Sequence, residues 1–377
     1  MSRLSLWYLV VTRLVVNTAH RFLYPFLPAI ARGLGISLEQ AGLMLSARSI
    51  AFVATPAVVS TVGRGERRVR LAAFGLSLMA AGALITAASG VPAGALVGLF
   101  LLGLGKPSFD AAAQSYVADR TPYWRRARYL SILELTWAGG MLIGAPAAGW
   151  LIAAHGWRAP FWVVAALLAV AAATASRILD GDTGDTGARL GRFRPGRQGK
   201  ALLLTGLLFS LAAETTFIVF GAWLEDGFGL TAAGLGLAAM TVAIAELAGE
   251  GSVLVFADRL GPRRMVALGL GASVAGYLGI ALASGSLVGG LTVVAAAFVA
   301  FEITIVSTVP LASEAEPAGR ARFLAWLMVA VGIGRAAGDA LGPLLYGWKG
   351  FGATGLASAL VAGLALLTLL VAVDEPG

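Results

Sequence analysis

The chain of 377 residues contains no cysteine and only two histidines, His20 and His155. The missing cysteines exclude disulfides and thiolate-bound metals. The sequence also has no Gly-x-x-x-x-Gly-Lys-Ser/Thr loop, no His-Glu-x-x-His and no Gly-x-Ser-x-Gly, the motifs typical of nucleotide hydrolysis, zinc hydrolysis and nucleophilic catalysis. We therefore expect no enzyme activity and no bound metal or cofactor.

Charged residues are scarce as well. They make up 13% of the chain, about half the share of an ordinary soluble domain, and the mean hydropathy is +0.83. A membrane-spanning helix needs roughly 20 mostly apolar residues. Because backbone groups in lipid must pair within their own element, we expect an all-α integral membrane protein. Polar or turn-forming breaks predict twelve transmembrane helices, at 4–31, 37–62, 71–89, 93–118, 129–153, 160–178, 200–222, 231–256, 265–284, 288–312, 322–346 and 352–373.

The net charge of +8 is unevenly placed along the chain. Most of the 28 basic residues lie at the N-terminus and in every second loop, the distribution that marks the cytoplasmic side of a membrane. We therefore expect both termini in the cytoplasm and no nucleic-acid partner. Asn17 is the only asparagine, and Thr18-Ala19 follow it, so the chain has no N-glycosylation acceptor. We expect a multi-pass monomer in the bilayer of a bacterial cytoplasmic (inner) membrane.

One phrase occurs twice in the sequence. Arg126-Ala-Arg128-Tyr-Leu opens an apolar segment that closes on Gly156-Trp-Arg, and Arg320-Ala-Arg322-Phe-Leu opens another that closes on Gly347-Trp-Lys. Arg126 and Arg320 are 194 residues apart, about half the chain. An internal repeat of whole apolar spans is typical of secondary transporters built from two related halves.

The long interior break at 179–199 is rich in Gly, Asp and Arg. Such a composition predicts a solvated cytoplasmic linker. It divides the chain into an N-terminal six-helix bundle, 1–178, and a C-terminal six-helix bundle, 200–377.

The loop after the eighth span reads Phe256-Ala-Asp-Arg-Leu-Gly-Pro-Arg-Arg264. In this loop the chain resembles the major facilitator superfamily, whose cytoplasmic signature is Asp-Arg-x-Gly-Arg-Arg. The loop after the second span, Gly63-Arg-Gly-Glu-Arg-Arg68, keeps the glycine and the basic residues but lacks the aspartate. The resemblance covers essentially the whole chain and implies two pseudo-symmetric six-helix bundles. Asp258 can accept from backbone amides of a neighbouring helix or pair with Arg259, Arg263 or Arg264, contacts that would form in one state and break in the other, so these four residues are gating candidates. The alternative is that the arginines only follow the positive-inside rule.

The fifth predicted span carries Gly140-x-x-x-Gly144-Ala145-Pro146-x-x-Gly149. This stretch is similar to the glycine-proline motif of antiporters in the same family, with one extra residue before the proline. The arginine common in the family's fourth span is not in its expected place, and Lys106 is the nearest basic residue.

Charged side chains inside the predicted spans are functional candidates, because a charge at mid-membrane costs several kcal/mol unless it is paired or faces water. They are unevenly shared between the halves. The first half has the cations Arg13, Arg21, Arg48 and Lys106 with the acids Asp110 and Glu134, whereas the second has Arg335 with Glu214, Glu246, Glu250, Glu302 and Asp339.

Polar residues on one face of the first span predict a lining for the central cavity. In the resembled family, spans 1, 4, 7 and 10 line that cavity, and all four carry polar groups here. The alternative is a hydrogen-bond network that packs helices together. The candidates for the substrate cavity are Arg13, Asn17, His20, Arg21, Tyr24, Arg48, Lys106, Gln114 and Glu246.

Buried carboxylates predict sites that load and release protons as access alternates. The candidates for proton coupling are Asp110, Glu134, Glu214 and Glu302. Lys106 and Asp110 are one helical turn apart, so an internal ion pair is equally compatible with them. The same spacing in Arg335 and Asp339 favours a structural pair.

Three functions are compatible with these patterns. The first is proton-coupled export, by antiport, of a small organic or amphiphilic molecule. The second is import or exchange of organic anions, with the arginines of the first half as the anion site. The third, from another class, is translocation of lipid.

Overall fold

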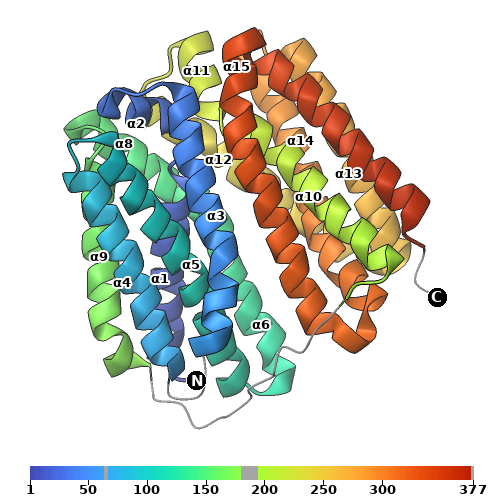
Figure 1. Ribbon diagram of the computed structural model, residues 1–377, viewed down its shortest axis with the longest axis horizontal. Helices are drawn as coiled ribbons and strands as arrows, with labels where there is room; N and C mark the ends of the chain where they lie inside the picture. Colours follow the sequence, from blue (N-terminus) through green and yellow to red (C-terminus); the bar gives the residue numbers. More distant parts are fainter. Residues whose placement is uncertain (63–66, 180–193, 375–377) are drawn as a thin grey trace. The chain divides into compact units, whose positions relative to one another are not determined.

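The computed structural model of the protein describes residues 1–62, 67–179 and 194–374, and all regular secondary structure in these ranges is helical (Figure 1). In chain order the helices are α1 (Arg3–Arg21), α2 (Leu27–Leu34), α3 (Leu38–Val62), α4 (Arg67–Ala88), α5 (Pro92–Arg120), α6 (Tyr123–Glu134), α7 (Thr136–Gly139), the π-helix η1 (Gly140–Gly144), α8 (Ala145–His155), α9 (Ala159–Ile178), α10 (Arg197–Phe217), α11 (Phe220–Phe228), α12 (Ala232–Leu260), α13 (Pro262–Ala283), α14 (Leu287–Ala315), the 3₁₀-helix η2 (Pro317–Gly319) and α15 (Arg320–Ala372). The predicted all-α class is confirmed.

Nine helices in the described part of the chain are long and apolar enough to cross a membrane. One of them, in α15, has non-helical backbone at Lys349 and Gly350, so this helix contains both of the last two predicted spans. The first two predicted spans, α1 with α2 and then α3, are not among the nine. Helix α1 is less apolar because it carries several cationic and polar residues. These assignments account for all twelve predicted spans.

The prediction of one continuous first span at 4–31 is wrong. Helix α1 ends at Arg21, residues 22–26 form a turn, and α2 begins at Leu27. Pro25 and Pro28 each remove a backbone donor from this stretch, which is why the helix is interrupted here. The seventh span is also interrupted, between α10 and α11, and it extends to Phe228 rather than to the predicted residue 222.

The chain divides into two compact units. Unit 1 comprises Met1–Ser37, Ala47–Leu190 and Ala232–Leu237, and unit 2 comprises Leu38–Ser46, Gly191–Thr231 and Ala238–Gly377. The predicted halves 1–178 and 200–377 stay a prediction, and most of the predicted linker 179–199 lies outside the described residues.

The two units repeat the same pairs of neighbouring helices. In unit 1, α4 packs against α5 and α9, and α1 packs against α7 and η1. In unit 2, α13 packs against α14 and α15, and α10 packs against α15. The third and fourth spans of each half are therefore neighbours, and so are the first and fifth.

Glycines with left-handed backbone mark the repeat at the level of single residues. Gly35 (φ 66°) and Gly229 (φ 64°) end α2 and α11, and Gly156 (φ 83°) corresponds to Gly350 (φ 71°). Both pairs are separated by the same 194 residues as Arg126 and Arg320. Such a φ favours glycine, which has no Cβ to clash. The halves therefore keep one register from the second predicted span to the sixth.

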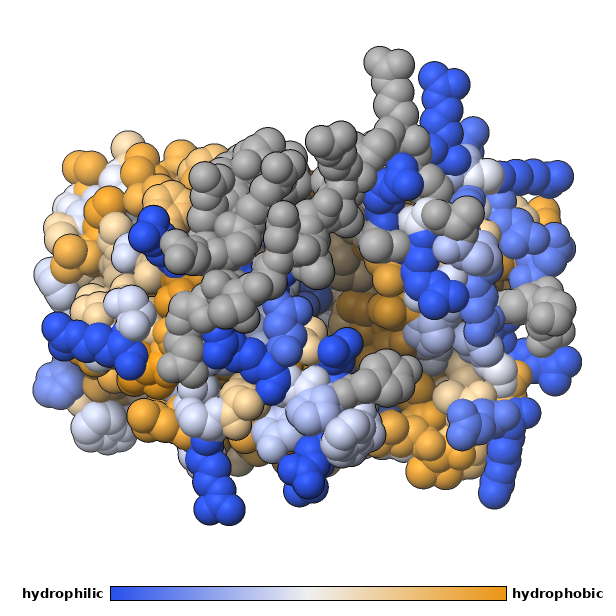
Figure 2. Space-filling view, turned by 90° about the horizontal axis from the view of Figure 1, so that it is seen from below, coloured by the Kyte–Doolittle hydropathy of each residue, from blue (hydrophilic) through white to orange (hydrophobic). Residues whose placement is uncertain are grey.

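Seen from below, hydrophilic side chains project from the end of the helices at which α6 begins, and hydrophobic side chains lie along the sides of the helices (Figure 2). At the starts of α4 and α6, Arg70, Arg125 and Arg128 are exposed. Large apolar side chains are exposed on the helices, among them Leu254 and Leu282, as expected for surfaces that face lipid. The cytoplasmic position of the basic loops stays a prediction.

Candidate functional site

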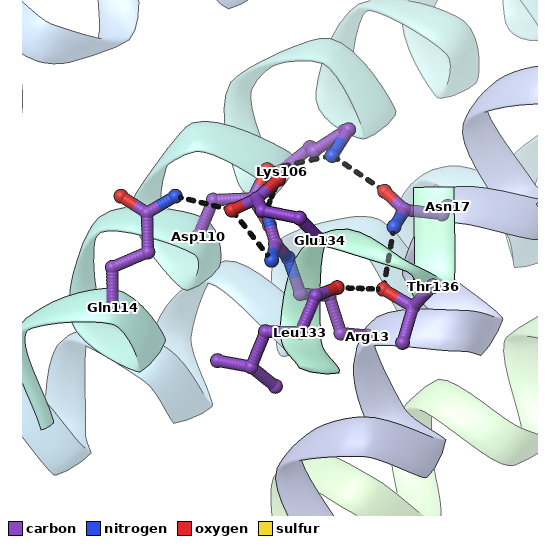
Figure 3. Close-up of polar contacts among 8 residues, drawn as sticks. All are labelled: Arg13, Asn17, Lys106, Asp110, Gln114, Leu133, Glu134 and Thr136. Carbon is purple, nitrogen blue, oxygen red and sulfur yellow. Dashed lines mark hydrogen bonds and ion pairs between the residues drawn. The ribbon is translucent and has the colours of Figure 1, made fainter. Parts of the chain in front are cut away.

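A network of charged and polar side chains lies inside unit 1, among α1, α5, α6 and α7 (Figure 3). Arg13 of α1 makes a bidentate ion pair with Glu134 of α6. Its Nη1 and Nη2 atoms lie 3.0 and 3.1 Å from the two carboxylate oxygens. Arg13 Nε also donates to Asp110 Oδ1 at 3.4 Å. One guanidinium thus joins two carboxylates from different helices.

Lys106 continues the network towards its buried end. Its Nζ atom donates to Asp110 Oδ2 at 2.6 Å and to Asn17 Oδ1 at 2.8 Å. Asn17 Nδ2 in turn donates to Thr136 Oγ1 at 3.0 Å, and Thr136 Oγ1 donates to the Leu133 carbonyl. The predicted Lys106–Asp110 pair is therefore present, as part of a chain of bonds across three further helices.

The network has a closed end and an open end. The side chains of Lys106 and Arg13 are 4% and 6% exposed, and Asn17 is fully buried. The Asp110 side chain is 17% exposed, whereas that of Glu134 is 50% exposed and accepts a bond from the exposed Gln114 at 3.2 Å. Glu134 and Gln114 therefore form the accessible end of the network.

The charges within this network balance. Two cations, Arg13 and Lys106, are bonded to two carboxylates, Asp110 and Glu134. A buried charge is tolerated when it is paired and hydrogen-bonded. The network therefore needs no external ion for neutrality when both acids are ionised.

The close approach of η1 to α1 positions this network. A Cβ atom at Gly144 would lie 2.2 Å from Thr18 Oγ1, so a larger residue there would clash with Thr18, and one at Gly140 would lie 3.0 Å from the Asn17 carbonyl carbon, a tight contact. The π-helix ends at Gly144, directly before Ala145 and Pro146, where the chain carries one residue more than the antiporter motif. A π-turn holds one extra residue without breaking the helix, so both ends of the span keep their contact with α1.

Trp137 is a site residue that the sequence analysis missed. Arg21 stacks over its ring, with Cζ 4.4 Å from the centroid, and donates to its carbonyl at 3.0 Å. Lys106 Nζ is 5.5 Å from the same centroid, and the His20 ring is 6.1 Å away. Two cations on one indole are a cation–π arrangement. The signal available in the sequence was an aromatic residue three positions after Glu134, on the same helical face.

Arg48 of α3 and Tyr24 also lie in unit 1. Arg48 is fully buried and donates from Nη1 to the His20 carbonyl at 2.7 Å and from Nη2 to Tyr24 Oη at 2.6 Å. Arg13, Asn17, His20, Arg21 and Tyr24, the polar residues on one face of the first predicted span, are all buried. The lining of a substrate cavity by these residues stays a prediction.

In unit 2, Glu214 of α10 lies 3.8 Å from Arg335 Nε of α15 through its Oε2 atom. Its other oxygen, Oε1, is buried without a hydrogen-bond partner in the described part of the chain. Glu246, Glu302 and Asp339 are buried as well. The sequence had suggested a pairing of Arg335 with Asp339, and the structure adds this contact between helices.

The candidate gating loop joins α12 to α13 in unit 2. Asp258, Arg259 and Arg264 are exposed, whereas Arg263 is partly buried and donates to the Val373 carbonyl at 2.8 Å and the Leu370 carbonyl at 3.4 Å. These carbonyls belong to the C-terminal end of α15, where a cation is favourable. Arg263 therefore ties this loop to the last helix of its own unit.

A profile of the Major Facilitator Superfamily matches residues 9–203, more than half of the chain. The chain belongs to the Major Facilitator Superfamily. This is a family of membrane transporters, and its match begins within α1 and runs through the whole network of unit 1.

Several curated proteins are similar to parts of the chain. The uncharacterized MFS-type transporter YwfA of Bacillus subtilis is 26% identical over 140 residues, which are 37% of this chain and 34% of YwfA. The putative uncharacterized transporter YgaY of Escherichia coli is 30% identical over 166 residues, 43% of this chain and 41% of YgaY. The chain thus spans less than half the length of these two relatives. The chloramphenicol resistance protein of Streptomyces lividans is 29% identical over 273 residues, 69% of this chain and 67% of that protein.

Solved transporters share the fold over nearly the whole chain. A bacterial homologue of the human lysosomal transporter Spinster, inward-facing and occupied, has a TM-score of 0.78 at 14% identity and covers 97% of this chain and 96% of its own. A POT family transporter has a TM-score of 0.78 at 13% identity, with 97% and 95% covered. The predicted all-α fold of the superfamily is confirmed, and the twelve predicted spans agree with it.

Proposed function

We propose that the protein is a secondary transporter working by alternating access, and that it exports a small organic or amphiphilic molecule in exchange for protons. The observation that carries this proposal is Glu214. Its carboxylate is buried, one oxygen lacks a hydrogen-bond partner among the described residues, and the other is 3.8 Å from Arg335. A carboxylate so weakly paired is suited to binding and releasing a proton.

The distribution of charge supports the same proposal. Unit 1 neutralises Arg13 and Lys106 with its own Asp110 and Glu134, whereas unit 2 buries Glu214, Glu246, Glu302 and Asp339, and Arg335 is the single cation within its predicted spans. Protons are the simplest cations to balance such an acid excess. We place Glu214 and Glu302 first among the proton carriers, and Asp110 and Glu134 after them.

This charge balance weighs against the import of organic anions. An anion site needs cations that are free to meet the substrate, and Arg13 and Lys106 already bind carboxylates of their own unit. The relative from Streptomyces lividans favours export, because it is a chloramphenicol resistance protein similar to 69% of this chain. Chloramphenicol is therefore the first substrate to test.

The proposal is tested in proteoliposomes that hold an inside-acid pH gradient and receive radiolabelled chloramphenicol outside. We expect accumulation that collapses with a protonophore. Glu214→Gln should abolish accumulation but keep exchange of labelled for unlabelled chloramphenicol, because only the proton step is lost. The matched control is Glu314→Gln, an exposed acid of the same half.

Two outcomes would overturn parts of the proposal. Accumulation by Glu214→Gln at the wild-type rate would exclude Glu214 as the proton carrier. Transport that is indifferent to the pH gradient, or movement of fluorescent lipid without soluble substrate, would exclude proton-coupled export of small molecules.

A further inference from the structure

The unwound turn at residues 22–26 leaves the end of α1 in need of a donor. In a continuous helix the Tyr24 amide would close on the His20 carbonyl, but here it donates to the Arg21 carbonyl at 3.2 Å. Within a membrane, backbone groups freed by a helix break are satisfied by neighbouring elements. Arg48 of α3 supplies that donor, with Nη1 2.7 Å from the His20 carbonyl oxygen.

The equivalent position in unit 2 keeps the backbone hydrogen bond that is missing in unit 1. Shifting by the repeat of 194 residues, His20 corresponds to Glu214, Tyr24 to Ile218 and Arg48 to Val242. There the Ile218 amide donates to the Glu214 carbonyl at 3.0 Å, as in a regular helix. An arginine is therefore present in the half that lacks the backbone bond, and a valine in the half that keeps it.

The contacts of both Nη atoms of Arg48 fit this role, while its Nε atom is buried without a hydrogen-bond partner among the described residues. Arg48 is fully buried, and its second Nη atom donates to Tyr24 Oη at 2.6 Å, inside the turn itself. Its Cζ atom lies 5.1 Å from the Tyr24 ring centroid. The positive guanidinium also lies at the C-terminal end of α1, where the helix dipole favours a cation.

We infer that Arg48 is a positioning residue that replaces the missing backbone donor at His20 and holds the turn at 22–26 through Tyr24. By fixing the end of α1 it keeps the neighbouring Arg21 stacked on Trp137, at 4.4 Å. It thereby sets the register of α1 against the network of unit 1. This inference does not depend on the substrate or on proton coupling.

Hydrogen–deuterium exchange of the full-length protein, purified in detergent, tests the inference. In Arg48→Met we expect the amides of residues 22–27 to exchange at least about tenfold faster, the effect of losing a hydrogen bond to a charged group. Arg48→Lys should restore part of the protection, because an ammonium can still donate to the His20 carbonyl. Val242→Met is the matched control, and peptides around Ile218 should exchange as in the wild type.

If Arg48→Met fails to fold, Tyr24→Phe gives the same test, because it removes only the Oη contact and should speed exchange in the turn by a smaller factor. Unchanged exchange at residues 22–27 in Arg48→Met, or in Tyr24→Phe if Arg48→Met does not fold, would overturn the inference. A transport assay with chloramphenicol adds a separate arm that rests on the proposed function. There, Arg48→Lys should be faster than Arg48→Met, and a failure of that assay with intact exchange data would concern only the proposed function.

Discussion

Asp110 holds the centre of the network in unit 1, because it accepts from both Lys106 and Arg13. Glu134 pairs with one cation, Arg13, accepts a further bond from the exposed Gln114, and is half exposed. The two carboxylates therefore differ in what their loss leaves behind. Without Asp110, two buried cations lose a partner, whereas without Glu134 one cation loses a partner that is half exposed.

We predict that Asp110→Asn destabilises the protein more than Glu134→Gln. Removing one partner of a buried pair costs about 3–5 kcal/mol, and a partly exposed charged hydrogen bond about 1 kcal/mol. Thermal unfolding in detergent should give the lower Tm for Asp110→Asn. The double variant Lys106→Met/Asp110→Asn should recover part of the loss, since the pair is then removed together. Equal Tm values for the two single variants would contradict this assignment.

The stacking of Arg21 on the Trp137 ring also predicts an effect on stability. We predict that Trp137→Leu lowers the Tm, since it removes an aromatic face worth about 1–2 kcal/mol when desolvated. Trp137→Phe should retain most of that stability. Trp150, which is 63% exposed, provides the control Trp150→Leu, with little expected change. A similar Tm for Trp137→Leu and Trp150→Leu would show that the stacking contributes nothing.

At the scale of the element, η1 explains how residues on both sides of it in the fifth span can face the same helix, α1. Thr136 and Trp137 lie before it and face α1, and Gly144 at its end also faces α1. An extra residue in a regular α-helix would rotate everything beyond it by about 100°. The π-turn absorbs that residue locally.

We predict that deletion of Ile143, a 59% exposed residue within η1, is tolerated because the turn becomes α-helical and both flanks keep their phase. Deletion of Leu167, a 49% exposed residue within the regular helix α9, should abolish folding, because it rotates the second half of that helix. Membrane yield and a monodisperse size-exclusion profile measure the difference. Loss of the folded protein on deleting Ile143, with Leu167 tolerated, would refute this account of η1.

At the scale of the whole molecule, the two halves share the backbone conformation of the repeat but not its charged residues. The left-handed glycines recur at the same spacing, yet the residues that correspond to Arg13, Asn17 and Lys106 are Leu207, Leu211 and Ala300. The two units thus share one helical framework, and the ionic network belongs to the first. Because their charged residues differ, we expect the two halves to have different functions.

We predict that the halves insert separately. A fragment of residues 1–189 should accumulate in the membrane and resist limited proteolysis, because α1 through α9 supply their own packing and their own ion pairs. A control fragment that ends at Gly90, between α4 and α5, should be degraded, because it lacks the partners of Arg13 and of α4. Equal protease sensitivity of the two fragments would argue against an independent unit 1.

The sequence by itself determined the class of this protein. Apolar length fixed the spans, because backbone in lipid must bond within its own helix, and the repeated phrase indicated two related halves. It also placed Lys106 beside Asp110, since a spacing of four residues is one helical turn. These are local or periodic properties of the sequence, and they can be recognised before the fold is known.

The tertiary structure decided which charges meet. Arg13 and Glu134 are 121 residues apart in the chain, and only the packing of α1 against the fifth span joins them. The same packing brings Trp137 under Arg21, and brings Arg48 to the carbonyl left open by the turn after α1. Contacts between distant helices depend on how side chains fill shared space, and no spacing along the sequence encodes that.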